Sequence, residues 1–319
     1  MNSISAMEKE IRYQIDFLSK LDLPDQEDLD NCLFIGAGDS YVAALIARYA
    51  SNYKAVCCNP MEIAFNQEII TRNCFRRVYI VSVSGNTQSN ILAAKIFRKH
   101  NIPTTAITSK SDSELARNCE DVIALKYKST GMTTSGTIGF MSSMLCCLSL
   151  ARKTDNLNQL GRIYRESSKE VRSLIDRCQG KASSSYIFLA DGILFPVAVY
   201  ATLKVNEVFG LKSFAYPTEE FCHSPLFSLK RKDKIITFAN KKYNLKQSEE
   251  LNDGLRRLGF SSAYILYLDE LSSTELLLKS TLVIQLFVVK QALKKGVKDC
   301  FFLRDKGLLK LSSDLIYNN

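Results

Sequence analysis

A lysine and a glutamate one helical turn apart, Lys204 and Glu207, lie within an otherwise apolar stretch of the chain. Pro196 can begin a helix there, and Gly210 can end it. On such a helix Lys204 falls on the apolar face and Glu207 lies at its edge. A buried charge needs either a partner or a function. The lysine could form a structural ion pair with Glu207 or Glu220. Alternatively, the pair could supply the base and the cation that proton transfer next to a carbonyl requires.

A second group of chemically useful residues is the run 82–87, Ser-Val-Ser-Gly-Asn-Thr. It lies where a predicted strand gives way to a helix, and helix N-termini favour anions. We therefore expect a phosphate to be held there by hydroxyl groups and backbone amides. The expected ligands are Ser40, Ser82, Val83, Ser84, Gly85 and Thr87. The alternative is that these residues only cap the helix. The run lacks the lysine and the spacing of a P-loop, so nucleotide hydrolysis is not expected.

Histidine and cysteine usage limits the possible metal chemistry. The chain contains two histidines, so a zinc site with two or three histidine ligands is excluded. His100 follows a predicted helix and is expected to be a solvated cation at its end. His223 could be either a buried, hydrogen-bonded histidine or a catalyst. The ten cysteines include no CxxC pair, which indicates buried free thiols in a reducing cytosol. We expect no metal and no cofactor.

Composition also limits the partners and the location. The chain has 319 residues, 46% of them hydrophobic and 24% charged, as in a globular protein. Apolar runs such as 192–203 are shorter than the ~18–20 residues that span a bilayer, so no membrane partner is expected. The N-terminus lacks a signal-peptide core, and we predict a cytoplasmic location. The basic runs 230–232 and 294–295 are too short for nucleic-acid binding. A net charge of +9 suits a small anionic ligand.

Alternating strands and helices predict an α/β fold with two tandem, doubly wound parallel sheets. The predicted strands are 33–36, 78–83, 104–108, 121–126, 186–190, 234–239 and 263–268. The predicted helices are 6–21, 41–49, 91–99, 138–150 and 249–258. The two halves repeat at an offset of about 155 residues, which indicates an internal duplication. Only the first half keeps the hydroxyl-rich turn, because the second has Ala-Asn-Lys-Lys at 239–242.

We expect four segments along the chain. Residues 1–155 would form a leading helix and the first lobe, which carries the phosphate loop. Residues 156–180 would connect the lobes. Residues 181–300 would form the second lobe with the lysine, glutamate and histidine, and residues 301–319 a C-terminal tail.

The segment Gly36-Ala37-Gly38-Asp39-Ser40-Tyr41, the run 82–87 and the duplicated plan together resemble the sugar isomerase (SIS) domain, which has a flavodoxin-like fold. The two-lobed form is similar to the isomerase half of glucosamine-6-phosphate synthase and to SIS-type glucosamine-6-phosphate deaminases. This resemblance covers nearly the whole chain and implies that the ligand is a sugar phosphate.

The second half carries a more specific resemblance. Residues 204–207 followed by Glu-Phe-Cys-His-Ser-Pro at 220–225 resemble the lysine–glutamate helix of the family and its Glu-Leu-Lys-His-Gly-Pro segment. The resemblance implies that Glu207 moves a proton between C1 and C2 and that Lys204 lies near the enediol oxygens. It implies that His223 opens the sugar ring, from the neighbouring subunit of a homodimer with shared active sites.

The resemblance also implies two further substrate-binding residues. These are Thr134 and Lys310. The latter lies in Leu308-Leu309-Lys310, which resembles the C-terminal segment whose lysine closes over the sugar. The Pro-Arg-Asn that precedes this segment in the family is absent here.

The expected function is the conversion of glucosamine 6-phosphate to fructose 6-phosphate and ammonia, through ring opening, C1–C2 proton transfer and hydrolysis of the C2 imine. Glutaminase activity is not expected, because residue 2 is Asn2 where such a domain needs a cysteine nucleophile. One alternative is a phosphosugar aldose–ketose isomerase that acts on glucose or mannose 6-phosphate. Another is a sugar-phosphate sensor without turnover, although a pure binder has no need of Lys204 and Glu207.

Overall fold

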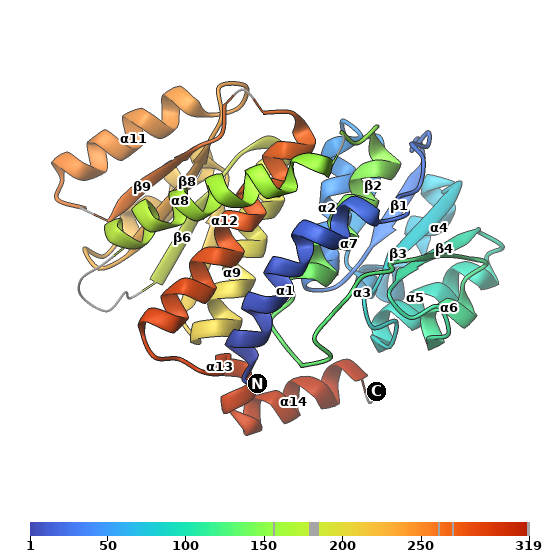
Figure 1. Cartoon of the computed structure of the whole chain (residues 1–319). Coiled ribbons are helices and arrows are strands. Elements are labelled where there is room, and N and C mark those ends of the chain that lie inside the picture. Colours follow the sequence, from blue (N-terminus) through green and yellow to red (C-terminus); the bar gives the residue numbers. More distant parts are fainter. Residues whose placement is uncertain (156, 179–184, 261, 270, 318–319) are drawn as a thin grey trace. The chain divides into compact units, whose positions relative to one another are not determined.

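Two parallel β-sheets with helices on both faces make up the computed structural model of the chain, as the alternation of strands and helices predicted (Figure 1). The structure describes residues 1–155, 157–178, 185–260, 262–269 and 271–317. The predicted segment boundary between residues 180 and 181, and residue 156, lie outside the described residues.

The chain divides into two compact units. The loop unit, named for the run 82–87, comprises Asp16–Thr130, Gly136–Asn156 and Asp305–Asn319. The Glu207 unit comprises Met1–Ile15, Gly131–Ser135 and Leu157–Arg304. Each unit contains one of the two sheets.

The sheet of the loop unit has the order β2-β1-β3-β4-β5. Its strands are β1 Cys32–Ile35, β2 Val56–Cys58, β3 Arg77–Val81, β4 Thr104–Thr108 and β5 Asp121–Ala124. The helices of this unit are α2 Asp39–Ala50, α3 Pro60–Phe65, α4 Glu68–Asn73, α5 Gln88–Lys99, α6 Glu114–Asn118, α7 Ile138–Ala151 and α14 Lys306–Tyr317. A short 3-10 helix, η1, spans Leu18–Lys20.

The sheet of the Glu207 unit has the order β7-β6-β8-β9. Its strands are β6 Ser185–Leu189, β7 Lys212–Tyr216, β8 Lys234–Ala239 and β9 Ala263–Tyr267. The helices are α1 Ser3–Phe17, α8 Leu160–Arg177, α9 Phe195–Phe209, α10 Thr218–Cys222, α11 Leu245–Arg257, α12 Ser273–Lys294 and α13 Phe301–Arg304. The 3-10 helices are η2 Leu157–Gln159, η3 Gly192–Leu194 and η4 Pro225–Ser228. This order repeats β2-β1-β3-β4 of the other sheet, as an internal duplication requires.

Alternating side chains of the strands form the two cores. In the loop unit, Leu33 and Val78 are paired in register and pack with apolar residues of α3, α5 and α6. The next residue on each of the two strands, Phe34 on β1 and Tyr79 on β3, belongs to the opposite face, and the two rings stack with their centres 4.6 Å apart. In the Glu207 unit, Tyr186 of β6 contacts Phe287 of α12. The inner strands β1, β3, β6 and β8 are buried on both faces, which explains their nearly continuous apolar sequences.

The leading helix was grouped with the first lobe in the sequence analysis, whereas its hydrogen bonds join it to the Glu207 unit. The backbone N–H of Ile4 donates to the carbonyl of Lys298 at 3.1 Å. The amide of Gln14 donates to the side chain of Gln285 in α12 at 2.7 Å.

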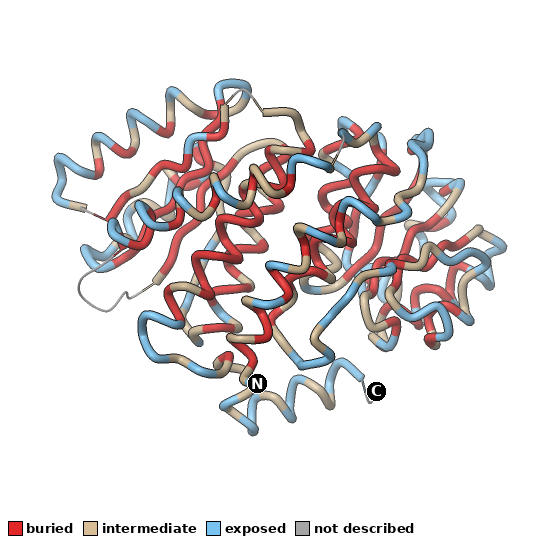
Figure 2. The backbone as a smooth tube through the Cα atoms, viewed as in Figure 1, coloured by how far each residue is buried: buried red, intermediate tan, exposed pale blue. Residues whose placement is uncertain are grey.

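The expectation that no apolar segment reaches membrane length was wrong. Residues 192–209 and α12 are long and apolar enough to cross a membrane by length and composition. However, 83% of the apolar window in α12 and 56% of that in 192–209 are buried within the protein. Figure 2 shows how much of α9 and α12 is buried. Their apolar character is accounted for by packing in the core of the Glu207 unit.

Candidate active site

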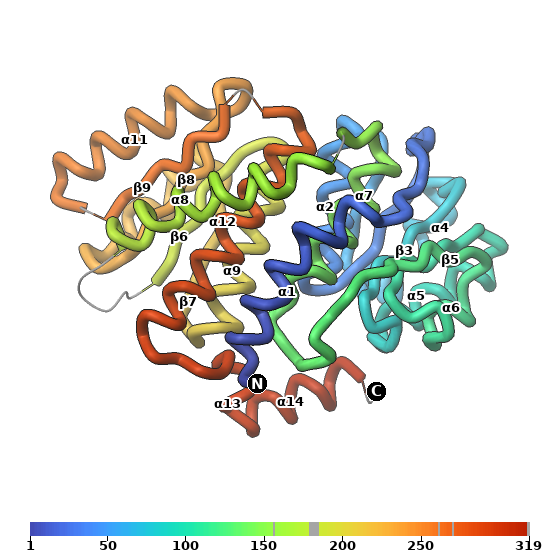
Figure 3. The backbone as a smooth tube through the Cα atoms, in the orientation of Figure 1, coloured from blue at the N-terminus to red at the C-terminus, as the bar shows by residue number. Residues whose placement is uncertain are grey.

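Helix α9 of the Glu207 unit (Figure 3) begins and ends as its sequence predicted. It carries both Lys204 and Glu207. Pro196 lies in its first turn, and Gly210 ends it in the left-handed conformation, with φ of +66°. A side chain at Gly210 would also collide with the ring of Phe301, because an added Cβ would lie 2.5 Å from that ring. The helix therefore stops at this position, and β7 follows directly.

Lys204 is fully buried, as its place on the apolar stripe indicated. Its Nζ donates to Oε2 of Glu207 at 2.7 Å and lies 5.0 Å from the centre of the Tyr200 ring. An ammonium removed from water is costly unless its charge is compensated. The carboxylate and the aromatic face supply that compensation here. Of the two ion pairs considered from sequence, the one with Glu207 is present, while Glu220 is exposed.

Glu207 lies at the surface end of this cluster, with 37% of its side chain exposed. Its Oε2 accepts hydrogen bonds from Lys204 and from the hydroxyl of Ser135. Within the described residues, its Oε1 has no hydrogen-bond partner. The two donors thus fix one carboxylate oxygen and leave the other available for a proton from outside. This is the geometry that a general base needs.

Ser135 was not predicted from the sequence. It is almost completely buried, and its neighbour Thr134 donates to Oε2 of Glu10 at 3.3 Å. Thr134, which was expected to bind substrate, is therefore engaged with α1 in this structure. Ser135 lies 72 positions before its carboxylate partner in a run of small polar residues without periodicity. Nothing in that local pattern indicated the contact.

The two histidines are both exposed. His100 follows α5 as its C-cap residue, as expected for a solvated position. His223 follows α10, where its backbone N–H donates to the carbonyl of Glu220 at 3.3 Å. Its exposure argues against the alternative of a buried, structural histidine. An exposed imidazole is accessible to a substrate or to a second subunit.

The anion loop, residues 82–87 of the loop unit, connects β3 to α5. The carbonyl of Val83 accepts hydrogen bonds from the Ser109 backbone N–H at 3.1 Å, the Ser109 hydroxyl at 2.7 Å and the Thr108 hydroxyl at 3.2 Å. Gly85 has φ of +66°, and a Cβ there would lie 2.1 Å from Oγ of Ser113. The conformation of this loop is therefore set by Gly85 together with the end of β4 and the residues that follow it.

The hydroxyl groups of the anion loop differ in the hydrogen bonds that they already make. Ser82 Oγ accepts from the N–H of Gly85 at 3.2 Å, and Ser84 Oγ accepts from the N–H of Asn86 at 3.3 Å. Both hydroxyls can still donate their own protons. Thr87 is the N-cap residue of α5 but makes no side-chain capping bond. Helix capping therefore does not explain the threonine at position 87. The backbone N–H of Gly85, in contrast, already donates to Ser82 Oγ within the loop.

Two further predicted ligands also lie in the loop unit. Ser40 is half-buried in the first turn of α2, and its N–H donates to the carbonyl of Ala37 at 3.1 Å. Lys310 lies on α14 with 80% of its side chain exposed, and it forms an ion pair with Asp314 at 3.8 Å. The structure thus gives Lys310 a helical, solvent-facing position.

The corresponding turns of the second sheet are occupied by the protein itself. Gly192 follows β6, and a Cβ there would lie 2.4 Å from the ring of Tyr243. The carboxylate of Asp191 accepts from Asn244 Nδ2 at 2.8 Å and from the backbone N–H of Thr218 at 3.2 Å. The turn after β8 corresponds to the anion loop, and it carries the ring of Tyr243 and, on Asn244, a hydrogen bond to the carboxylate of Asp191, so it is unsuited to an anion.

The cysteines are all free thiols, and seven of the ten are buried. Burial raises the pKa of Cys58 and that of Cys146 to about 12. Cys74 is exposed, contrary to the expectation of a buried thiol. Among the described residues, no group of three or more His, Cys, Asp or Glu side chains is placed to hold a metal ion.

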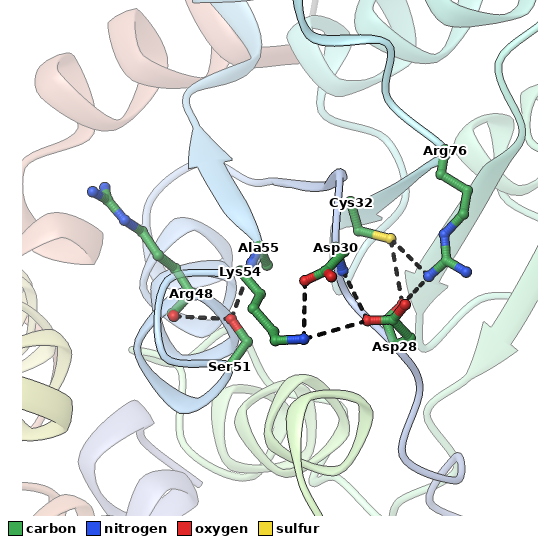
Figure 4. A network of polar contacts seen from close by, with 8 residues as sticks. All are labelled: Asp28, Asp30, Cys32, Arg48, Ser51, Lys54, Ala55 and Arg76. Carbon is green, nitrogen blue, oxygen red and sulfur yellow. Dashed lines mark hydrogen bonds and ion pairs between the residues drawn. The ribbon is translucent and has the colours of Figure 1, made fainter.

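A cavity of about 540 Å³ lies at the opposite end of the loop-unit sheet from the anion loop, beside the start of β1. Figure 4 shows the polar network next to it, in which Lys54 Nζ lies 3.1 Å from Asp30 and 3.8 Å from Asp28. The guanidinium of Arg76 donates to the carbonyl of Asp28. These charges compensate one another, and none belongs to the predicted site.

Comparison with known proteins agrees with this architecture. The family model of the SIS domain matches residues 28–151. The glutamine–fructose-6-phosphate aminotransferase (isomerizing) of Chlamydia caviae is 23% identical over 237 residues, which cover 66% of this chain and 38% of that protein. The chain thus spans about two fifths of the length of this relative.

Solved structures share the fold at low sequence identity. The C-terminal domain of glucosamine-fructose-6-phosphate aminotransferase from Francisella tularensis superimposes with a TM-score of 0.76 at 19% identity, covering 91% of this chain and 96% of that one. Glucosamine-6-phosphate deaminase from Thermotoga maritima gives a TM-score of 0.71 at 22% identity, covering 92% and 96%.

The chain is therefore a two-sheet α/β protein of the fold seen in these sugar-phosphate enzymes. The match of the SIS domain model to residues 28–151 agrees with the resemblance found in the sequence.

Proposed function

We propose that this protein is an amino-sugar-phosphate isomerase that also deaminates its substrate, converting glucosamine 6-phosphate to fructose 6-phosphate and ammonia. The observation that carries the proposal is the arrangement at Glu207. One of its carboxylate oxygens is held by Lys204 and Ser135, and the other has no partner among the described residues. A sugar-phosphate sensor has no need of a buried cation that orients an outward-facing carboxylate.

Each step of the proposed reaction has a candidate residue. His223 assists the opening of the sugar ring. Glu207 then takes the proton from C2 of the open-chain aldose, next to the C1 aldehyde, and returns it to C1, which leaves an imine at C2. Lys204 stabilises the negative charge that develops during this transfer. Water then hydrolyses the C2 imine, which releases ammonia and leaves the ketose phosphate.

The phosphate group is assigned to the anion loop in this proposal. Thr87 offers a hydroxyl that does not cap its helix, and the protons of the Ser82 and Ser84 hydroxyls remain available. The N-terminus of a twelve-residue helix, α5, adds a favourable dipole. The carboxylate of Asp191, which accepts a hydrogen bond from Asn244, makes the corresponding turn after β8 a poor second phosphate site.

The decisive experiment supplies glucosamine 6-phosphate and glucose 6-phosphate separately and measures both ammonia and ketose phosphate. Ammonia and fructose 6-phosphate in equal amounts from the first substrate support the proposal. Ketose formation from glucose 6-phosphate without nitrogen chemistry would instead identify an aldose–ketose isomerase. Saturable binding of either sugar phosphate without any product would contradict an enzymatic function and leave the sensor.

A further inference from the structure

A buried chain of polar side chains links Lys204 to the interior of the Glu207 unit. Tyr200 Oη accepts a hydrogen bond from Gln285 Nε2 at 3.1 Å, and Gln285 Oε1 accepts one from Gln14 Nε2 at 2.7 Å. Lys204 Nζ lies 5.0 Å from the centre of the Tyr200 ring. Tyr200, Lys204 and Gln285 are completely buried, and Gln14 is 1% exposed. We call Gln14, Gln285 and Tyr200 the relay.

The relay lies in an environment that disfavours polar groups. Gln285 occupies the middle of α12, between Ile284 and Leu286 in a long apolar helix that is mostly buried. A buried amide is tolerated when both its N–H and its oxygen are hydrogen-bonded. Gln285 uses both in the relay. An apolar residue would fill this position without the need for two matched partners, so the amide points to a requirement other than packing.

We propose that Tyr200 is a positioning residue for the reaction, and this inference rests on the proposed role of Glu207. The hydrogen bond from Gln285 fixes the Tyr200 ring. The ring then holds the Lys204 ammonium through a cation–π contact. The ammonium in turn holds Oε2 of Glu207 and keeps Oε1 turned outward.

The spacing along α9 makes this sequence of contacts direct. Tyr200 and Lys204 are four residues apart, and Lys204 and Glu207 are three apart, so consecutive members face each other on one side of the helix. A lysine side chain has a flexible four-carbon stem and does not fix its own geometry. The ring on one side and the carboxylate on the other confine its ammonium group.

Three variants and one control test the inference on the full-length protein. Tyr200→Leu removes the ring, and Tyr200→Phe keeps the ring but loses the hydroxyl. Gln285→Met removes the amide that donates to Tyr200 and keeps the side chain at nearly constant size. Gln291→Met is the matched control, because Gln291 is a buried glutamine of the same helix outside the relay. Turnover, KM and melting temperature are measured on the same preparations.

We expect Tyr200→Leu to lower kcat by about tenfold or more, with KM changed by less than about threefold. Tyr200→Phe keeps the ring but loses the hydrogen bond from Gln285, so its loss of kcat should be smaller than that of Tyr200→Leu and similar to that of Gln285→Met. Gln285→Met should lower kcat by more than Gln291→Met does. This pattern separates positioning from general packing, since packing defects lower the melting temperature without a selective effect on kcat. If Tyr200→Leu does not fold, the comparison of Gln285→Met with Gln291→Met decides.

The outcomes distinguish this inference from the proposed function. Wild-type protein that turns over no sugar phosphate would contradict the proposed function and the role of Tyr200 with it. Normal wild-type turnover with an unchanged kcat in Tyr200→Leu, or in Gln285→Met, would contradict the role of the relay alone.

Discussion

Lys204 and Glu207 share a hydrogen bond of 2.7 Å although they occupy different environments, because the ammonium is fully buried and 37% of the carboxylate side chain is exposed. The pair thus presents a negatively charged oxygen at the surface while its counter-ion stays in the core. A pair that served stability alone would gain little from this arrangement, since buried ion pairs are weak stabilisers. The asymmetry suits a base that must reach a substrate.

The first prediction concerns phosphate binding. Thr87→Val should lower the affinity for sugar 6-phosphates by about tenfold or more, because a hydrogen bond to a charged group contributes about 1.5–3 kcal/mol. Valine has nearly the shape of threonine, and the hydroxyl it replaces does not cap α5. Calorimetric titration with glucosamine 6-phosphate and with glucosamine, which lacks the phosphate, measures the effect. An equal loss for both ligands would show that Thr87 has a structural role only.

The conformation of the anion loop gives a second prediction. Gly85→Ala should weaken sugar-phosphate binding and lower the melting temperature, because the new methyl group would lie 2.1 Å from Oγ of Ser113. Gly131→Ala is the matched control, since Gly131 also has a positive φ of +72° but open space around it. Both variants carry similar backbone strain, so the difference between them isolates the collision. If the two variants lose the same affinity and melt at the same temperature, contact with Ser113 does not set the conformation of the anion loop.

The third prediction concerns assembly. We propose that His223 acts in a homodimer with shared sites, and its exposed position is compatible with that role. Specific activity should then fall on dilution as the dimer dissociates, and mixing inactive His223→Ala with inactive Glu207→Gln protein should restore part of the activity. Sedimentation and activity are measured over the same concentration range. A monomer with full activity would rule out shared sites.

The fourth prediction concerns stability in alkaline solution. Burial raises the pKa of Cys146 from its usual value of 9.0 to about 12. The folded state therefore keeps a proton that the unfolded state loses, so this stabilisation is complete below pH 9 and decreases as the pH rises toward 12. Between pH 9 and 10.5 the loss amounts to about 2 kcal/mol for this thiol. The melting temperature of Cys146→Ala should fall less steeply over this range. If the melting temperatures of the wild-type protein and of Cys146→Ala fall equally with rising pH, the prediction is contradicted.

Much of the fold could be predicted because its elements carry strong local signals. The strands Thr104–Thr108 and Lys234–Ala239 are buried runs rich in β-branched residues, and both were predicted with the bounds they have in the structure. Pro196 and Gly210 marked the ends of α9 correctly. By contrast, β2 has three residues and β7 alternates exposed and half-buried positions, so neither was predicted.

The candidate site was predictable where its residues are close in sequence. The burial of Lys204 followed from helical periodicity. The contact of Ser135 with Glu207 and the relay through Gln285 join residues 72 and 85 positions apart, which no local pattern specifies. A glutamine within the apolar run 282–289 was the available signal for the relay. Its meaning depends on which helices pack together, and that information appears only in the folded chain.

The central claim is that Glu207 is the base, and the variant Glu207→Gln tests it most directly. Glutamine keeps the size of the side chain and can still accept a hydrogen bond from Lys204, but it cannot take the proton. The variant should fold, bind glucosamine 6-phosphate with nearly unchanged affinity, and release ammonia more slowly by a factor on the order of 10²–10⁴. Loss of the negative charge beside the buried Lys204 lowers the stability, by up to about 3–5 kcal/mol, whether or not Glu207 is the base. The turnover of the folded fraction therefore decides, with melting temperature and ammonia release measured on one preparation: slow turnover by folded protein supports the assignment, and a destabilised variant with normal specific activity contradicts it.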